Sequence, residues 1–397
     1  MVRIGEDRSE RLDITPVRFR VLVTVRPRYA CPTGRAGVVQ QKAPPAVIEG
    51  GLPTEAIIAH VLVSKYSEHL PLYREARVTA RHGISIDRST LADWVGRAAF
   101  HLAPVVDRMA TLLKRSGKLF MDETTAPVLD PGRGRTKTGY LRAMLRDDRP
   151  WGGDDPPGVV FACAPGRSGV HAERMLEGFE GILQVDGYAG CNRLADDRRE
   201  HGAPLHLAYC RAHARREIIK ATPKAGSPIA EEAPTRVAAL YGIEKDIRGQ
   251  GPERRRAVRQ EKSVPLLDEL EAWLCAQAAR LSRKSEMGKA VAYILTRWQG
   301  LGLFAGDGRV EMDSNLVENQ IRPLALTRKN ALFAGHDEGA QNWARIASLI
   351  ATCKMNGVEP FAYLKATLEA IAAGPPNAEL DDLLPWAFPK ATVKAAA

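Results

Sequence analysis

Two aspartates follow short apolar runs in the same way. The run 119–121 leads into Asp122, and the run 182–185 leads into Asp186. A carboxylate buried at the end of a strand is costly in free energy unless a positive charge lies nearby. If the two runs are neighbouring strands of one sheet, their carboxyl ends bring the two acids together. The alternative is that each aspartate only caps the turn that follows it.

A third acid, Glu318, lies in the segment 313–322, which predicts a short helix stopped by Pro323. Glu318 and Arg322 are four residues apart, so they share one face of that helix. The functional interpretation gives Glu318 to a metal ion and Arg322 to a DNA phosphate or to orienting the carboxylate. The structural alternative is a capping box with Asn315, which would make Glu318 part of the helix start only.

The three acids suit one kind of chemistry. Carboxylate oxygens are the ligands that divalent Mg²⁺ or Mn²⁺ prefers. Two such ions about 3.5–4 Å apart activate an attacking hydroxyl and stabilise the leaving oxygen of a phosphodiester. We therefore expect Asp122, Asp186 and Glu318 to converge as catalytic residues and metal ligands, although they are 64 and 132 residues apart. Arg328 and Lys329 add positive charge where a DNA backbone would lie.

Cys210 and His213 stand at C-x-x-H spacing and are followed by Arg215 and Arg216. A structural zinc site needs about four ligands, and no second pair stands at ligand spacing nearby. We therefore favour a structural or DNA-contacting role for this segment over zinc binding. Arg215 and Arg216 are taken as DNA contacts.

The elements that would hold these residues have α/β order between 116 and 335. Strands are predicted at 119–122, 140–145, 159–163, 182–185 and 205–210, and a helix near 171–177. Three neighbouring strands followed by alternating helix and strand is the order of a ribonuclease-H-like α/β domain. The segment 226–300 predicts a helical insertion in this catalytic core, and its basic stretch 248–262 is expected to be exposed.

Three further regions flank the core. Residues 1–50 predict a small β-rich module with a half-buried strand over 17–25. Residues 51–115 predict a helical, helix-turn-helix-like DNA-binding region in which 89–100 is the candidate reading helix. An ordinary helical hairpin fits the same pattern. Residues 336–397 predict a C-terminal helical region.

The composition favours a nucleic-acid partner. The chain of 397 residues has 57 Lys and Arg against 47 Asp and Glu, a net charge of +10. This excess attracts polyanions. Six scattered cysteines without a C-x-x-C pair indicate reduced thiols. No apolar run is long enough to span a bilayer, and the charged start is unlike a signal peptide, so we expect a cytoplasmic protein without a membrane partner.

Motifs along nearly the whole chain resemble the insertion sequence 66 family of transposases. They are IGED at 4–7, SERLD at 9–13, HVLVSKY at 60–66, LPLYR at 70–74, VLDPGRG at 128–134, QVDGYAG at 184–190, AHARR at 212–216, DSNLVENQIR at 313–322, RKNALFAG at 328–335 and KMNGV at 354–358. The resemblance is specific because many long motifs occur in the right order.

The resemblance implies a ribonuclease-H-like core, with a helical insertion before the glutamate, that binds divalent metal and cuts and joins DNA ends. By motif, the two aspartates and the glutamate of such enzymes map onto Asp122, Asp186 and Glu318. The expected partners are the terminal inverted repeats of the element, target DNA, further copies of the chain and small accessory transposition proteins.

One departure from the family concerns zinc. Relatives carry an N-terminal zinc ribbon made from two C-x-x-C knuckles. Here the first knuckle is absent, and Cys31-Pro32-Thr33-Gly34 is what remains of the second. The chain is therefore expected to begin inside the ribbon. A single thiolate cannot make a four-ligand site, so zinc is not expected as a cofactor.

Two other functions fit the same residues. One is a DNA-binding remnant that has lost transposition together with its zinc ribbon. The other is a nuclease or resolvase of the same core fold that does not join strands. The presence of all three carboxylates argues against catalytic decay, and cleavage and joining assays would separate the three functions.

Overall fold

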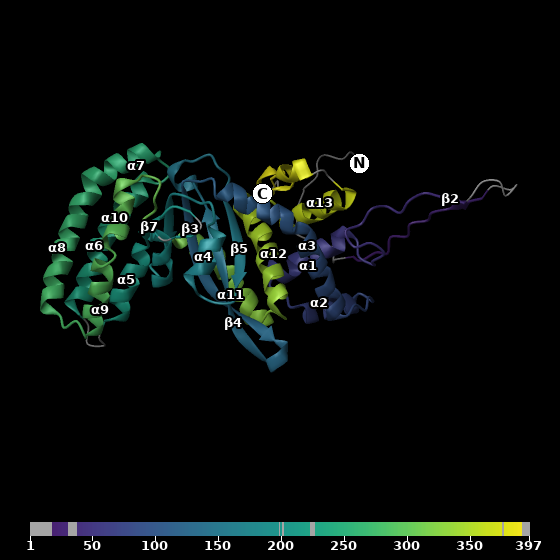
Figure 1. The fold of residues 1–397 in the computed structure, drawn as a ribbon, viewed down its shortest axis with the longest axis horizontal. Helices are drawn as coiled ribbons and strands as arrows, with labels where there is room; N and C mark the ends of the chain where they lie inside the picture. The colour runs from purple at the N-terminus through teal and green to yellow at the C-terminus, as the bar shows by residue number, and fades with distance from the viewer. Residues whose placement is uncertain are drawn as a thin grey trace, which may run out of the picture.

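The computed structural model describes residues 18–30, 38–197, 199–200, 202–222, 227–374 and 377–390. Figure 1 shows a central sheet with helices on both sides and an extended arm that points away from them. The Cys31–Gly34 segment, on which the zinc prediction rests, lies outside the described residues.

One mixed sheet forms the centre of the molecule. Its strands are β3 (Lys118–Asp130), β4 (Arg135–Arg146), β5 (Gly158–Ala164), β6 (Ile182–Val185) and β7 (His206–Tyr209), in the spatial order β5-β4-β3-β6-β7. β3, β4 and β5 pair antiparallel, whereas β6 and β7 run parallel to β3. Helix α4 (Gly169–Met175) connects β5 to β6. The expectation of an α/β core is confirmed, because each apolar run predicted as a strand is part of this sheet.

Strand β3 is longer than its apolar run predicts. It continues beyond Asp122 to Asp130, paired on one side with β4. On the other side its pairing with β6 ends at Phe120 and Gln184. Asp122 is therefore in the middle of a strand, just past the point where β3 loses a neighbour, and not at a strand end.

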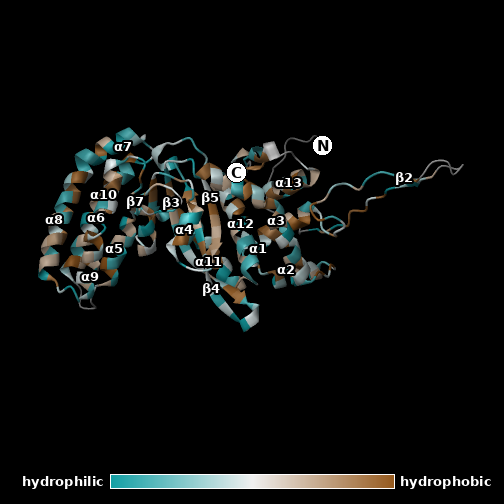
Figure 2. Cartoon of the chain, viewed as in Figure 1, coloured by the Kyte–Doolittle hydropathy of each residue, from teal (hydrophilic) through white to brown (hydrophobic). Residues whose placement is uncertain are grey.

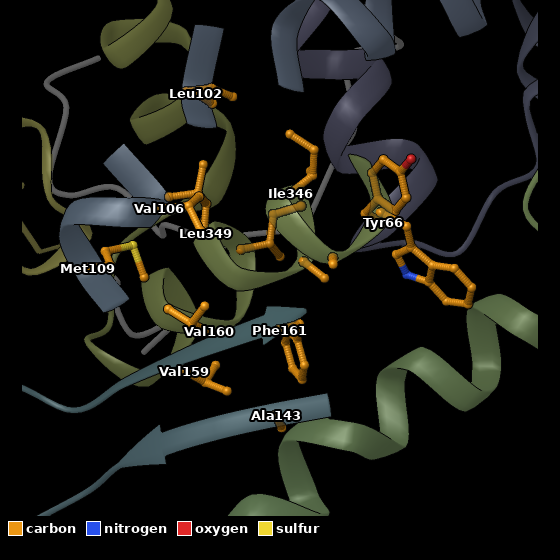
Figure 3. Close-up of a cluster of buried hydrophobic side chains, with 14 of the residues drawn as sticks. Tyr66, Leu102, Val106, Met109, Ala143, Val159, Val160, Phe161, Ile346 and Leu349 are labelled. Carbon is orange, nitrogen blue, oxygen red and sulfur yellow. The ribbon is translucent and has the colours of Figure 1, made fainter. Parts of the chain in front are cut away.

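Helices from distant parts of the sequence cover the sheet on the side of β5. They are α1 (Glu55–Tyr66), α2 (Leu72–Arg81), α3 (Arg88–Leu113), α12 (Asp337–Met355) and α13 (Pro360–Ala373). Figure 3 shows side chains of α3, β5 and α12, among them Met109, Phe161 and Leu349, meeting in one buried cluster. Figure 2 shows hydrophobic residues along β5 and on the helices that border it. The candidate reading helix 89–100 is thus the first half of a longer helix, whose second half packs on the sheet.

The outer edge of β5 is covered by side chains of α12. Ser348 Oγ accepts a hydrogen bond from the Phe161 N–H at 2.8 Å. Thr352 Oγ1 accepts from the Val159 N–H at 3.1 Å and donates to the Val159 carbonyl at 3.1 Å. Because Ser348 and Thr352 are four residues apart, they lie on one helix face, and the helix supplies hydrogen bonds where a sixth strand would.

The segment after β7 is helical. It comprises α5 (Arg211–Lys220), α6 (Pro228–Ile247), α7 (Pro252–Val258), a π-helical turn (Arg259–Ser263), α8 (Val264–Arg280), α9 (Glu286–Leu295) and α10 (Trp298–Gly306). The expectation that the whole stretch 248–262 is exposed is wrong: Arg255 and Arg259 are buried. Their guanidinium groups pair with Glu244, at 3.3 and 2.6 Å. These charges stabilise the insertion and are not available to a ligand.

Helix α11 (Asn315–Ala331) carries Glu318 and does not stop at Pro323 as predicted. Proline removes one helical hydrogen bond. Burial of Leu324 and Thr327 beyond it keeps the chain helical as far as Ala331.

The N-terminal arm also differs from expectation. The half-buried strand predicted over 17–25 is not found in its described part. The pairing that the structure describes there is between β1 (Arg28–Tyr29) and β2 (Val39–Gln40). Val21 and Val23 are 86% and 80% exposed, so within the described residues these side chains are not covered by a second layer.

Candidate active site

The register of the sheet gives Asp122 and Asp186 equivalent positions just beyond the paired part of β3 and β6. Lys118 pairs with Ile182 and Phe120 with Gln184, an offset of 64 residues. The same offset separates Asp122 from Asp186, the residue that follows β6. The two aspartates therefore follow the last paired residues of two neighbouring parallel strands by the same number of positions.

Asp122 is half-buried, and other acids lie near its carboxyl group. Burial raises its pKa to about 7; the hydrogen bond from the Glu123 N–H opposes this shift, and the charges of Asp186 and Glu318 add to it. The Glu123 N–H donates to Asp122 Oδ1 at 2.7 Å. The influence of Asp186 and Glu318 on one carboxyl group means that all three acids share a single electrostatic environment.

Glu318 reaches this environment from the first turn of α11. The helix begins at Asn315 with Ser314 as its N-cap, and the Ser314 side chain makes no capping hydrogen bond. The capping box predicted with Asn315 is therefore absent, and the Asn315 N–H is instead bonded to Asp313 Oδ1 at 3.0 Å. The Glu318 carboxylate lies 3.7 Å from Arg216 Nη2.

The five basic residues predicted to contact DNA lie in different parts of the structure. Arg216 on α5 lies beside Glu318, and its side chain is 44% exposed. Arg328 is hydrogen-bonded to Thr125, its Nη1 donating to the carbonyl at 2.5 Å and to Oγ1 at 2.8 Å. Arg215, Arg322 and Lys329 are exposed. One predicted contact, Arg216, is therefore adjacent to the acids.

Cys210 connects the elements that carry two of the acids. Its N–H donates to the carbonyl of Val185 at 3.1 Å, and its Sγ accepts from the Ser314 N–H at 3.3 Å. It thus ties the residue before Asp186 to the start of the Glu318 helix.

His213, one turn along α5, faces the same environment. Burial lowers its pKa and the positive charge of Arg216 adds to this shift, whereas the negative charges of Asp186 and Glu318 oppose it. Its Nδ1 is buried without a hydrogen-bond partner among the described residues.

A second set of contacts, which sequence reasoning missed, begins at Glu123, the residue after Asp122. Glu123 Oε2 lies 2.9 Å from Nη2 of Arg142, and Glu123 Oε1 accepts from Arg167 Nε. The Arg167 guanidinium lies 3.7 Å from the centre of the Tyr188 ring. An arginine in the otherwise apolar strand 140–145, opposite an acid, is the one sequence feature that could have indicated this contact.

The donor set fits a hard divalent cation. The three acids offer carboxylate oxygens, and no Lys or Arg side chain in the described ranges forms an ion pair with Asp122 or Asp186. Within the part of the chain that the structure describes, no three His, Cys, Asp or Glu side chains are grouped tightly enough to enclose an ion. The acids are therefore close enough to affect each other's charge but are not in ligand geometry.

Comparison with known proteins defines the class of protein. Residues 50–342 match the model described as Transposase IS66 family, and residues 348–386 match the IS66 C-terminal element. Residues 1–33 match the zinc-finger binding domain of transposase IS66. The chain belongs to the IS66 family of transposases, which implies a role in DNA transposition.

Longer relatives, of which the chain covers about three quarters, occur in Sinorhizobium fredii (strain NBRC 101917 / NGR234). The uncharacterized protein y4jD is 45% identical over 386 residues, covering 97% of this chain and 76% of the relative. The uncharacterized proteins y4qI and y4hP are 45% and 38% identical, each covering 98% of this chain and 72% of the relative. Within the described residues, no helix is both long and apolar enough to cross a membrane.

Proposed function

We propose that Asp122, Asp186 and Glu318 are the catalytic acids of a DNA transposase that cleaves and joins insertion-sequence ends. The observation that carries the proposal is the sheet register, in which Asp122 and Asp186 each follow by two residues the last β3–β6 pair, Phe120 and Gln184; the combined effect of Asp186 and Glu318 on the Asp122 carboxyl group supports it. Family membership supports the reaction class. The strand order, with three antiparallel strands followed by two parallel ones, supports a ribonuclease-H-like core.

The three carboxylates would hold Mg²⁺ or Mn²⁺, which supplies activation of the attacking hydroxyl and stabilisation of the leaving oxygen. Asp122 and Asp186 each use one carboxylate oxygen to accept a backbone N–H, at 2.7 and 2.9 Å. Those bonds fix the direction of the second oxygen. Glu318, on helix α11, would be the third carboxylate ligand. Arg216, which lies beside Glu318, can exchange this carboxylate for a DNA phosphate.

The exposed arginines and lysine then act as DNA contacts. Arg215, Arg322 and Lys329 contribute long-range attraction and phosphate contacts that do not depend on base sequence. Arg328 would first have to release Thr125, so we assign it a structural role in the free protein.

The test is cleavage of a duplex that carries the element ends, in Mg²⁺, by the full chain. Asp122→Asn and Asp186→Asn should each lose cleavage at least about a hundredfold, or ~2.7 kcal/mol, while DNA affinity stays near wild type. Glu369→Gln, an exposed acid on α13 paired with Lys365, is the matched control. Cleavage by both aspartate variants at the control rate would contradict the proposal. A joining assay with pre-cut ends separates a transposase from a nuclease that does not join strands.

A further inference from the structure

The turn that carries Asp186 contains a glycine in a conformation that other residues rarely adopt. Gly187 has a φ of +96°, in the left-handed region. A Cβ at Gly187 would lie 2.5 Å from Tyr293 Oη and 3.4 Å from Arg297 Nε. The glycine therefore permits the turn and also the close approach of two side chains from the helical insertion.

These two side chains bind consecutive carbonyl groups of the turn. Tyr293 Oη donates to the carbonyl of Asp186 at 3.3 Å, and Arg297 Nε donates to the carbonyl of Gly187 at 3.2 Å. Tyr293 is on α9, and Arg297 is the residue before α10. Both therefore reach the turn from the insertion, which has a hydrophobic core of its own.

One of the bound peptide groups also orients the Asp186 side chain. The carbonyl of Gly187 and the N–H of Tyr188 belong to the same planar peptide group. That N–H donates to Asp186 Oδ1 at 2.9 Å. When Arg297 holds the carbonyl end of this group, it also holds the N–H end, and with it the direction of the Asp186 carboxylate.

Tyr293 and Arg297 also hold each other. The Arg297 guanidinium carbon is 3.9 Å from the centre of the Tyr293 ring, and its Nη1 donates to the Tyr293 carbonyl at 3.3 Å. Stacking and hydrogen bonding reduce the rotamer freedom of a long arginine side chain. Less conformational entropy is then lost when it binds the turn.

We infer that Tyr293 and Arg297 are positioning residues, through which the helical insertion fixes the carboxylate of Asp186 for binding a divalent cation. The inference rests on the proposed metal-binding role of Asp186. The helical insertion contributes none of the three proposed acids. Through its contacts with the backbone of the Asp186 turn, it would still affect metal binding and therefore the reaction.

The first measurement is hydrogen exchange of the metal-free full chain. In Arg297→Gln, the Tyr188 amide should exchange about tenfold faster than in wild type, because its peptide group is no longer held. The matched control is Arg236→Gln. Arg236 is also an arginine of the insertion stacked on an aromatic ring, 5.3 Å from the centre of Trp273, and it pairs with Glu232 on its own helix. It should leave the Tyr188 amide unchanged.

The second measurement is Mn²⁺ affinity by calorimetry, with the melting temperature of each variant recorded beside it. Arg297→Gln should bind Mn²⁺ about tenfold more weakly, and Tyr293→Phe about threefold, with little change in melting temperature for Tyr293→Phe. DNA affinity should change equally in Arg297→Gln and Arg236→Gln, since each removes one positive charge.

The proposed metal site and the positioning role of Tyr293 and Arg297 are refuted by different results. If wild type binds no Mn²⁺, or Asp186→Asn binds it as well as wild type, the proposed metal site is wrong, and amide exchange still decides whether Arg297 holds the turn. If the Tyr188 amide and Mn²⁺ affinity are unchanged in folded Arg297→Gln and Tyr293→Phe, the positioning role is overturned. An equal loss of Mn²⁺ affinity in Arg236→Gln would also overturn it, because charge alone would then explain the effect.

Discussion

Replacing Glu318 by Gln is the sharpest test of the acid on α11. Glutamine keeps the size of the side chain and removes its negative charge. We expect cleavage to fall at least about a hundredfold, or ~2.7 kcal/mol in activation free energy, because a cation-stabilised transition state loses one of its three anionic ligands.

The structure also sets the expected effect of this change on stability. The Glu318 side chain is 26% exposed, and its partner Arg216 is 44% exposed at 3.7 Å. An ion pair of this kind contributes about 0–1 kcal/mol. No capping box is lost, because Asn315 does not cap the helix through Glu318. The free energy of unfolding should therefore change by less than about 1 kcal/mol.

Cleavage and DNA affinity are measured on the same end-containing duplex, and unfolding is followed in urea. Glu369→Gln removes an exposed acid of another helix and is expected to behave as wild type in all three measurements. Cleavage by Glu318→Gln at a rate near that of Glu369→Gln would refute the catalytic role. A loss of several kcal/mol in the free energy of unfolding would instead show that Glu318 stabilises the fold.

Three further predictions concern stability and the Cys210 contact. Burial raises the pKa of Glu75 to about 7, above its value in the unfolded chain, so stability from this group is present at low pH and lost as pH rises from about 5 to 8. Glu75→Gln should reduce the loss by ~2–3 kcal/mol in urea titrations, and an unchanged pH dependence would contradict the assignment. Cys210→Ala should destabilise the chain by about 1–2 kcal/mol, with Cys210→Ser recovering part of the loss, whereas a zinc role predicts metal release on either change. Thr352→Val should lower the free energy of unfolding by about 2–3 kcal/mol, because it leaves the N–H and C=O of Val159 without their side-chain partner. The control Thr111→Val, on the exposed face of α3, should lower it by less than about 0.5 kcal/mol. Equal losses in the two variants would show that the contact at the edge of β5 does not stabilise the protein.

The strands of the core could be predicted from sequence because each is a short apolar run in a buried sheet. The same runs predicted that Asp122 and Asp186 would be neighbours, since parallel strands align their ends. That β3 continues past Asp122 could not be predicted, because three polar residues, 123–125, interrupt the apolar run and the stretch to Asp130 is held by pairing with β4.

Other features depend on contacts between distant residues, which a local pattern does not contain. Arg255 and Arg259 appear as part of a basic, exposed stretch, but Glu244 on another helix allows their burial. Pro323 is locally a helix breaker, and only the packing of α11 on the sheet overrides it. The role of Gly187 depends on Tyr293, 106 positions later, and no spacing rule connects the two.

The covering of β5 by α12 has a consequence for how the chain is made. An open strand edge pairs readily with other strands, and α12 removes that possibility in the finished molecule. The bonds from Thr352 to Val159 join residues 193 positions apart. At about 5–20 residues per second, a ribosome needs roughly 10–40 s to travel that distance. During this interval β5 has emerged but its cover has not, so each newly made molecule passes through a period in which strand-to-strand association with other nascent chains competes with correct folding.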